Sequence, residues 1–113
     1  MADPRVEWTD AARDDLRSIV FRIAQDSLDD AFAVAGRLER RVGTLGTLTA
    51  RGRVVPELRK MGERRFRELI EGPWRILYLT KGPSVSIIAI VDSRRNLNDW
   101  LREQMSRFHQ AKL

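Results

Sequence analysis

The apolar residues change their spacing near Gly52, and this change limits the folds that the chain can adopt. Before Gly52, apolar residues recur three and four positions apart, the period of an amphipathic helix, as in Leu16, Ile19, Val20 and Ile23. After it, short apolar segments are separated by turn residues, a pattern typical of β-strands. We therefore predict an α+β domain in which helices come first and cover one face of a sheet.

Two helices are predicted in the first half, one over residues 10–24 and one that begins after Ser27. Thr9 or Asp10 is suited to cap the first helix, and Ser27 the second. The second helix carries small and apolar residues spaced four and three apart, namely Ala31, Ala35, Leu38, Val42 and Leu45. Since only a few residues separate the two helices, they should fold back as an antiparallel hairpin.

The second half is predicted to form an antiparallel meander, with strands at residues 53–56, 65–70, 74–80 and 85–91. The last strand is apolar at almost every position, so we expect it inside the sheet. Strict alternation predicts one face formed by Val85, Ile87, Ala89 and Val91. A further short strand is expected at residues 5–8, with Val6 and Trp8 directed to the core.

A last helix is predicted from Asn96, which is suited to cap it. Its apolar residues recur at helical spacing, namely Leu97, Trp100, Leu101, Met105 and Phe108. No repeat or linker divides the chain, so we predict one domain over residues 1–113, with residues 96–113 as a C-terminal helical extension. That extension is a second candidate surface for a partner.

The composition excludes several kinds of site. The chain has no Cys and one His, His109, so it lacks the residues for a disulfide, a thiolate zinc site or a histidine-based triad. No apolar run is long enough to span a membrane, and the first residues do not form a secretory signal. We therefore expect a cytoplasmic protein with no metal, no small-molecule cofactor and no membrane partner.

Positive charge is concentrated in the second half, where residues 51–113 contain 14 Lys and Arg against 7 Asp and Glu. Such a surface suits nucleic acid or an acidic protein, or is simply a solvated basic face. The fold-back of the last two strands brings Arg75 to the level of residues 90–94. We therefore predict a basic cluster of Arg75, Arg94 and Arg95 that contacts a target. The alternative for Arg75 is an ion pair with Glu68 or Glu71 across the sheet.

Two large apolar residues lie off the predicted core faces of the helices. Phe21 is outside the stripe that ends at Ile23, and Phe32 is turned about 100° from the stripe of the second helix. Exposed residues of this size often mark a site for a partner. The alternative is that both rings turn into the interface with the sheet.

Four segments resemble toxins of the RelE/ParE superfamily, which belong to type II toxin–antitoxin modules that stabilise plasmids or chromosomal regions. They are residues 6–16 (VEWTDAARDDL), 52–58 (GRVVPEL), 66–78 (FRELIEGPWRILY) and 91–97 (VDSRRNL). The resemblance extends over about residues 5–101 in the order strand, helical hairpin, antiparallel meander. It implies a cognate antitoxin whose C-terminal segment wraps the hairpin, where Phe21 and Phe32 are the candidate contacts.

The superfamily contains two activities, and the residue types favour one. RelE-like members are ribosome-dependent mRNA endonucleases, whose arginines match Arg75 and Arg94 here. The lysines of that pattern fall near Phe66 and Glu68, however, and its tyrosine falls near Trp100. A phenyl ring and a carboxylate cannot supply the proton transfers and charge stabilisation that RNA cleavage requires.

The resemblance therefore favours the ParE-like branch, whose members poison DNA gyrase by binding and need no catalytic residues. One alternative is an mRNA endonuclease that acts on the ribosome and its mRNA through Arg75 and Arg94. Another is a non-toxic member that serves as a co-repressor with its antitoxin.

Overall fold

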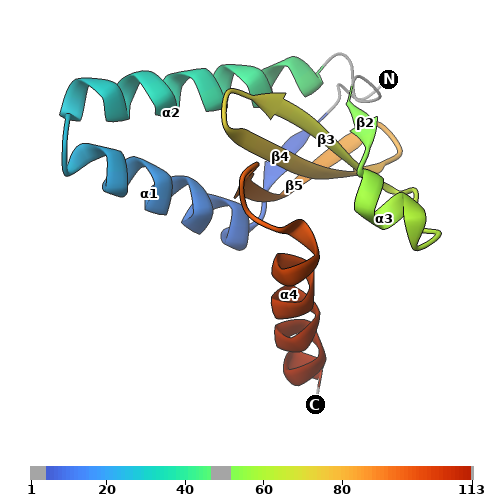
Figure 1. Ribbon diagram of the computed structural model, residues 1–113. Coiled ribbons are helices and arrows are strands. Elements are labelled where there is room, and N and C mark those ends of the chain that lie inside the picture. Colours follow the sequence, from blue (N-terminus) through green and yellow to red (C-terminus); the bar gives the residue numbers. More distant parts are fainter. Residues whose placement is uncertain (1–4, 47–51, 113) are drawn as a thin grey trace.

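The computed structural model describes residues 5–46 and 52–112, with side chains described as far as residue 104 (Figure 1). The elements follow in the order β1 (Val6–Trp8), α1 (Asp10–Ala24), α2 (Leu28–Gly43), a 3-10 turn (Thr44–Gly46), β2 (Arg53–Val54), α3 (Pro56–Lys60), β3 (Phe66–Glu71), β4 (Trp74–Lys81), β5 (Ser84–Asp92) and α4 (Leu97–Lys112). The predicted α+β class is confirmed. Among the described residues, no helix is both long and apolar enough to cross a membrane.

The strands form one mixed sheet in the order β1-β5-β4-β3-β2. Strands β2 to β5 make the predicted antiparallel meander. Strand β1 joins it at the far edge and runs parallel to β5, with Val6 opposite Val85 and Trp8 opposite Ile87. The last strand therefore lies inside the sheet, as predicted.

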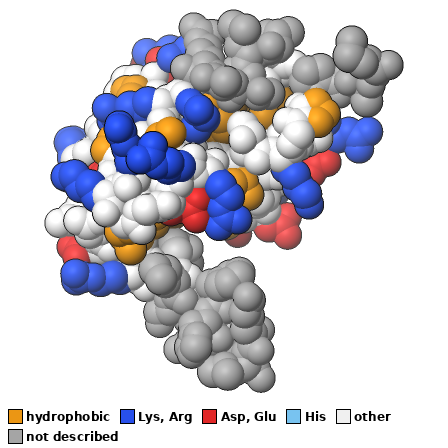
Figure 2. All heavy atoms as spheres, turned by 90° about the vertical axis from the view of Figure 1, so that its right-hand side faces the viewer, with side chains coloured by type: hydrophobic (Ala, Val, Ile, Leu, Met, Phe, Trp, Pro, Cys, Tyr) orange, Lys and Arg blue, Asp and Glu red, His pale blue; other side chains and the backbone are white. Residues whose placement is uncertain are grey.

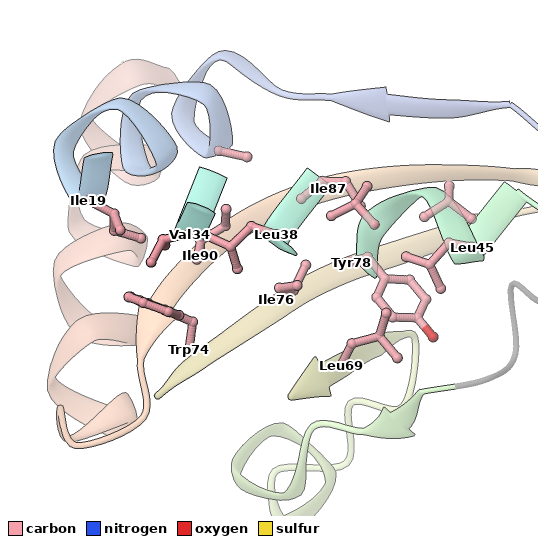
Figure 3. Packing of buried hydrophobic residues seen from close by; sticks show 13 residues of the cluster. Ile19, Val34, Leu38, Leu45, Leu69, Trp74, Ile76, Tyr78, Ile87 and Ile90 are labelled. Carbon is pink, nitrogen blue, oxygen red and sulfur yellow. The ribbon is translucent and has the colours of Figure 1, made fainter. Parts of the chain in front are cut away.

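The hairpin of α1 and α2 covers one face of the sheet (Figure 1). Both helices are capped as predicted, since the side chain of Thr9 accepts from the Ala12 N–H and that of Ser27 from the Asp30 N–H, each at 3.1 Å. Helix α2 buries Val34, whereas Ala35 is only half-buried, so the predicted seam was wrong at that position. Figure 3 shows the resulting core, to which β4 contributes Trp74, Ile76 and Tyr78.

A bulge in β5 reverses the facing of its side chains, so the strict alternation that we predicted was wrong. Leu77 of β4 pairs with Ala89 and Tyr78 pairs with Ile87, which leaves Ile88 as an extra residue. Val85 and Ile87 consequently pack in the core under the hairpin, whereas Ala89 and Val91 pack on the opposite face.

The opposite face of the sheet is covered by α3 and by the first turns of α4. Pro56 was predicted in a strand but begins α3, because proline suits the first turn of a helix, where its missing N–H needs no partner. A second apolar cluster forms here, consisting of Val55, Leu77, Ala89, Val91, Leu97 and Trp100.

Helix α4 begins where predicted and then runs away from the sheet (Figure 1). The side chain of Asn96 accepts from the backbone N–H groups of Asn98 and Asp99 at 2.9 and 3.3 Å. Leu97 and Trp100 are buried. The side chains of Met105, Phe108 and His109 lie outside the described part of the structure.

Candidate functional site

Arg75 lies in the middle of a buried ion-pair network on the face of the sheet opposite the hairpin. Its Nε donates to Glu68 Oε1 at 2.6 Å, and its two Nη atoms donate to the carboxylate of Glu57 at 2.8 and 2.9 Å. Only 9% of the Arg75 side chain is exposed, and that of Glu68 is completely buried. The alternative of an ion pair with Glu68 is confirmed, whereas Glu71 approaches Arg41 of α2 instead, at 3.9 Å.

Strand register explains why Arg75 and Glu68 meet. Arg75 is paired with Ile70, and Glu68 with Leu77, so the two charged residues are diagonal neighbours on adjacent strands. On its other side Glu68 is paired with Arg53 of β2, whose Nε donates to Oε2 at 2.7 Å. The two guanidinium groups therefore occupy both oxygens of the buried carboxylate.

Glu57 completes the network from α3, and sequence analysis missed it because residues 56–60 were not predicted to be helical. Its hydrogen bonds from Arg75 lower the pKa of Glu57, although partial burial acts in the opposite direction. The same bonds raise the pKa of Arg75. Two guanidinium groups and two carboxylates thus form a set with no net charge, the Arg75 network, made of Arg53, Glu57, Glu68 and Arg75.

The three arginines of the predicted cluster do not share one site. Arg94 donates to Asp92 at 2.7 Å, and this contact holds the pKa of Asp92 at about 2. Arg95 donates to Glu103 of α4 at 2.6 Å. Arg94 and Arg95 both line a cavity of about 490 Å³, and Arg75 is not among its lining residues.

This cavity lies where α1, the ends of β4 and β5, and α4 come together. Its lining includes Trp74 and Trp100 and three arginines, set against two carboxylates. The charged lining residues are Arg22, Arg94, Arg95, Asp15 and Asp92. The side chain of Arg94 is 82% exposed, so it can exchange Asp92 for a group on a partner. Guanidinium groups next to aromatic rings suit carboxylates or phosphates presented by a macromolecule.

Phe21 and Phe32 project from the turn end of the hairpin and are 72% and 70% exposed. The alternative in which they turn into the sheet interface is therefore wrong. Leu28, at the start of α2, is also exposed, at 64%. Its exposure was not predicted, because Leu28 precedes the periodic part of the helix. We call these three exposed residues near the turn between α1 and α2 the apolar patch, and their role in binding an antitoxin stays a prediction.

Gly52, where the spacing of the apolar residues changes, fixes the entry to β2, but the sequence did not show how closely other groups pack around it. Its N–H donates to the hydroxyl of Tyr78 at 2.9 Å, and its carbonyl accepts from Nη1 of Arg67 at 2.6 Å. A Cβ at this position would overlap the carbonyl oxygen of Glu68. Burial of Tyr78 raises the pKa of its hydroxyl.

Among the described residues, no group of three or more His, Asp or Glu side chains is arranged to hold a metal ion. The charged side chains that approach one another there are of opposite sign, either in pairs or in the Arg75 network.

Comparison with known proteins gives one family match and two informative structures. The family model of the ParE toxin of the type II toxin–antitoxin system parDE matches residues 6–97. A chain of the chromosomal ParDE system from P. aeruginosa is similar over 78% of this chain and 94% of its own, with a TM-score of 0.64 and 21% identity. A chain of the RelBE2 toxin–antitoxin complex from Mycobacterium tuberculosis is similar over 81% of this chain and 93% of its own, with a TM-score of 0.55 and 25% identity. No curated protein sequence matches significantly.

Proposed function

The chain belongs to the ParE toxin family of type II toxin–antitoxin systems, and from that premise we propose that it poisons DNA gyrase in the cytoplasm by binding. We further propose that a cognate antitoxin neutralises it. Both similar structures come from toxin–antitoxin systems, which supports an antitoxin partner. The choice of gyrase over the ribosome as the target depends on whether the side chain of Arg75 can reach a phosphate.

The Arg75 network is the observation that carries this choice. An arginine that stabilises a phosphate during RNA cleavage must reach that phosphate. Here Arg75 is held by Glu57 and Glu68 and is almost inaccessible. Freeing it would leave the buried carboxylate of Glu68 without one of its partners, which is strongly unfavourable. A toxin that acts by binding needs no such rearrangement.

Arg94 and Arg95 are the accessible part of the predicted basic cluster, and we assign the contact with gyrase to them and the cavity beside them. Both guanidinium groups lie at the surface, with 82% and 47% of the side chain exposed. Arg75 contributes to this surface indirectly from the interior, because its hydrogen bonds to Glu57 hold α3 against the sheet. Helix α4 begins at Leu97, separated from Arg95 only by its cap Asn96, so its exposed side can extend the same surface.

An assay with purified gyrase tests the proposal. The protein should inhibit supercoiling and cause linear DNA to accumulate, and Arg94→Glu/Arg95→Glu should reduce its potency about tenfold or more, which corresponds to ~1.4 kcal/mol or more of binding free energy. Their ion pairs are on the surface, so the double variant should remain folded.

Arg37→Glu/Arg40→Glu is the matched control, since it reverses two exposed charges on α2 and should leave the potency unchanged. The alternative activity is tested with translating ribosomes. Cleavage of mRNA inside them, abolished by replacement of Arg75, would contradict the proposal.

The apolar patch predicts how the antitoxin binds. Phe21→Asp and Phe32→Asp should each weaken binding of the antitoxin about 10- to 100-fold, the loss expected when one buried phenyl ring no longer contributes. Both rings are exposed in the free toxin, so the free energy of unfolding should change by less than about 0.5 kcal/mol. Calorimetric titration and urea unfolding measure the two effects. Ala33→Asp is the control, because Ala33 is also exposed on α2. Retained nanomolar binding of the antitoxin by both Phe variants would contradict the assignment of Phe21 and Phe32 to its binding site.

A further inference from the structure

The end of α3 and the turn that follows it carry several positive charges, and three of them form no ion pair with a carboxylate in the described part of the chain. We call residues 59–65 the basic turn; its cations are Arg59, Lys60, Arg64 and Arg65. Its one acidic residue, Glu63, is held by Arg65 through two side-chain hydrogen bonds of 2.8 and 2.9 Å. Glu57, in the preceding helix, is held by Arg75.

Arg59, Lys60 and Arg64 are exposed, and no acidic side chain within the described ranges forms an ion pair with any of them. Figure 2 views the molecule from the side on which α3 and β2 lie, and blue Lys and Arg side chains are spread over much of this face. The positive charge of the basic turn is therefore available to an outside partner.

Backbone hydrogen bonds hold the basic turn in one conformation. The N–H of Met61 and the N–H of Glu63 both donate to the carbonyl of Leu58, at 2.9 Å, and the N–H of Gly62 donates to the carbonyl of Arg59 at 3.0 Å. Gly62 has a φ of 85°, which only glycine adopts readily. The cations are thus presented on an ordered support, which reduces the entropy lost on binding.

The support is fastened to the sheet at two points. Leu58 packs against the apolar cluster on this face, and Glu57 binds Arg75 through both of its oxygens. The Arg75 network therefore fixes the position from which the basic turn projects.

The chemistry of the basic turn fits a phosphodiester backbone better than an acidic protein. Protein interfaces draw most of their affinity from a desolvated apolar or aromatic centre, and the basic turn offers only the exposed thioether of Met61. Exposed cations bind a nucleic acid without such a centre, because each phosphate contact releases condensed counterions.

We infer that the basic turn binds the backbone of duplex DNA through Arg59, Lys60 and Arg64. This inference rests on the proposed function, since a toxin that acts on gyrase meets duplex DNA in the gyrase–DNA complex. Contacts from the basic turn would add to the contacts that Arg94 and Arg95 make with the enzyme, and would favour the DNA-bound form of gyrase as the target.

Fluorescence anisotropy with a labelled DNA duplex, measured over a range of salt concentrations and without gyrase, tests this inference. Each phosphate contact contributes about 0.9 to the slope of log K against log salt. Arg59→Gln/Lys60→Gln/Arg64→Gln should therefore lower the slope by about 2–3 and weaken binding at low salt about tenfold or more. Because gyrase is absent, failure of the proposed target does not affect the result.

Arg13→Gln/Arg37→Gln/Arg40→Gln is the matched control, because it removes three exposed charges from the hairpin. It should retain the slope of the unmodified protein. Equal losses in the two variants would show an effect of net charge alone and overturn the inference. So would absence of DNA binding, or tighter binding to single-stranded RNA or to an acidic peptide than to the duplex.

Discussion

Replacing Arg75 by methionine is expected to lower the free energy of unfolding by about 3–5 kcal/mol, because it leaves a buried carboxylate without one of its two partners. Glu68 is completely buried and would retain only Arg53, whose own side chain is 61% exposed. A loss of that size is a large part of the ~5–15 kcal/mol that stabilises a domain of this kind. Urea unfolding followed by circular dichroism measures it.

Two further variants separate the buried charge from other effects of the substitution. Arg94→Met breaks a surface ion pair of similar geometry and should cost less than about 1 kcal/mol. Glu57→Gln/Glu68→Met/Arg75→Met removes the buried charges together and should recover most of the lost stability. A loss below about 1 kcal/mol in Arg75→Met would mean that Glu68 does not depend on Arg75, and the argument against RNA cleavage would lose its basis.

Gly52→Ala is expected to destabilise the protein by about 1–3 kcal/mol or more, the usual range for an atom forced into a filled space. The new methyl group would overlap the carbonyl oxygen of Glu68 and lie 2.6 Å from the hydroxyl of Tyr78. Strand β2 would have to move away from β3, and the hydrogen bond between the Gly52 N–H and Tyr78 would be lost. The midpoint of urea unfolding reports the change.

Gly43→Ala is the control for this substitution, since a Cβ placed at that residue meets no atom within 4 Å apart from its chain neighbours and the backbone of its own helix. Gly43 is the last residue of α2, where alanine should be neutral or stabilise by up to about 1 kcal/mol. If the two alanine variants were equally stable, the close packing around Gly52 would not be a constraint on the fold.

Local patterns were sufficient to predict most of the elements. Hydrogen bonds within a helix and the alternation of a strand depend on near neighbours, so the boundaries of α1 and the caps at Thr9, Ser27 and Asn96 could be predicted from spacing and residue type. Helix α3 was missed because its five residues are too few to show a period.

The residues of the candidate sites also differ in how far local patterns could predict their surroundings. The angles of Phe21 and Phe32 around their helices placed them off the core faces, but whether the rings are exposed was left open and was decided by the structure. For Arg75, the sequence left a target contact and an ion pair with Glu68 or Glu71 as alternatives, and the strand register selects Glu68. The partner at Glu57 could not be predicted, because it reaches Arg75 from an element that was not recognised. The sequence also did not show that Arg75 and Arg94 have separate partners.

The sequence by itself determined the order of the helices and strands apart from α3, the overall α+β class and the resemblance to RelE/ParE toxins, because these depend on the type and spacing of nearby residues. Only the tertiary structure decided which charges remain available. One extra residue at Ile88 reversed the faces of a strand, and a short helix brought Glu57 to Arg75. An arginine side chain is either accessible to a partner or held in an internal ion pair, and which of the two applies depends on groups far away in the chain. Those groups come together only when the sheet and its covering helices have packed.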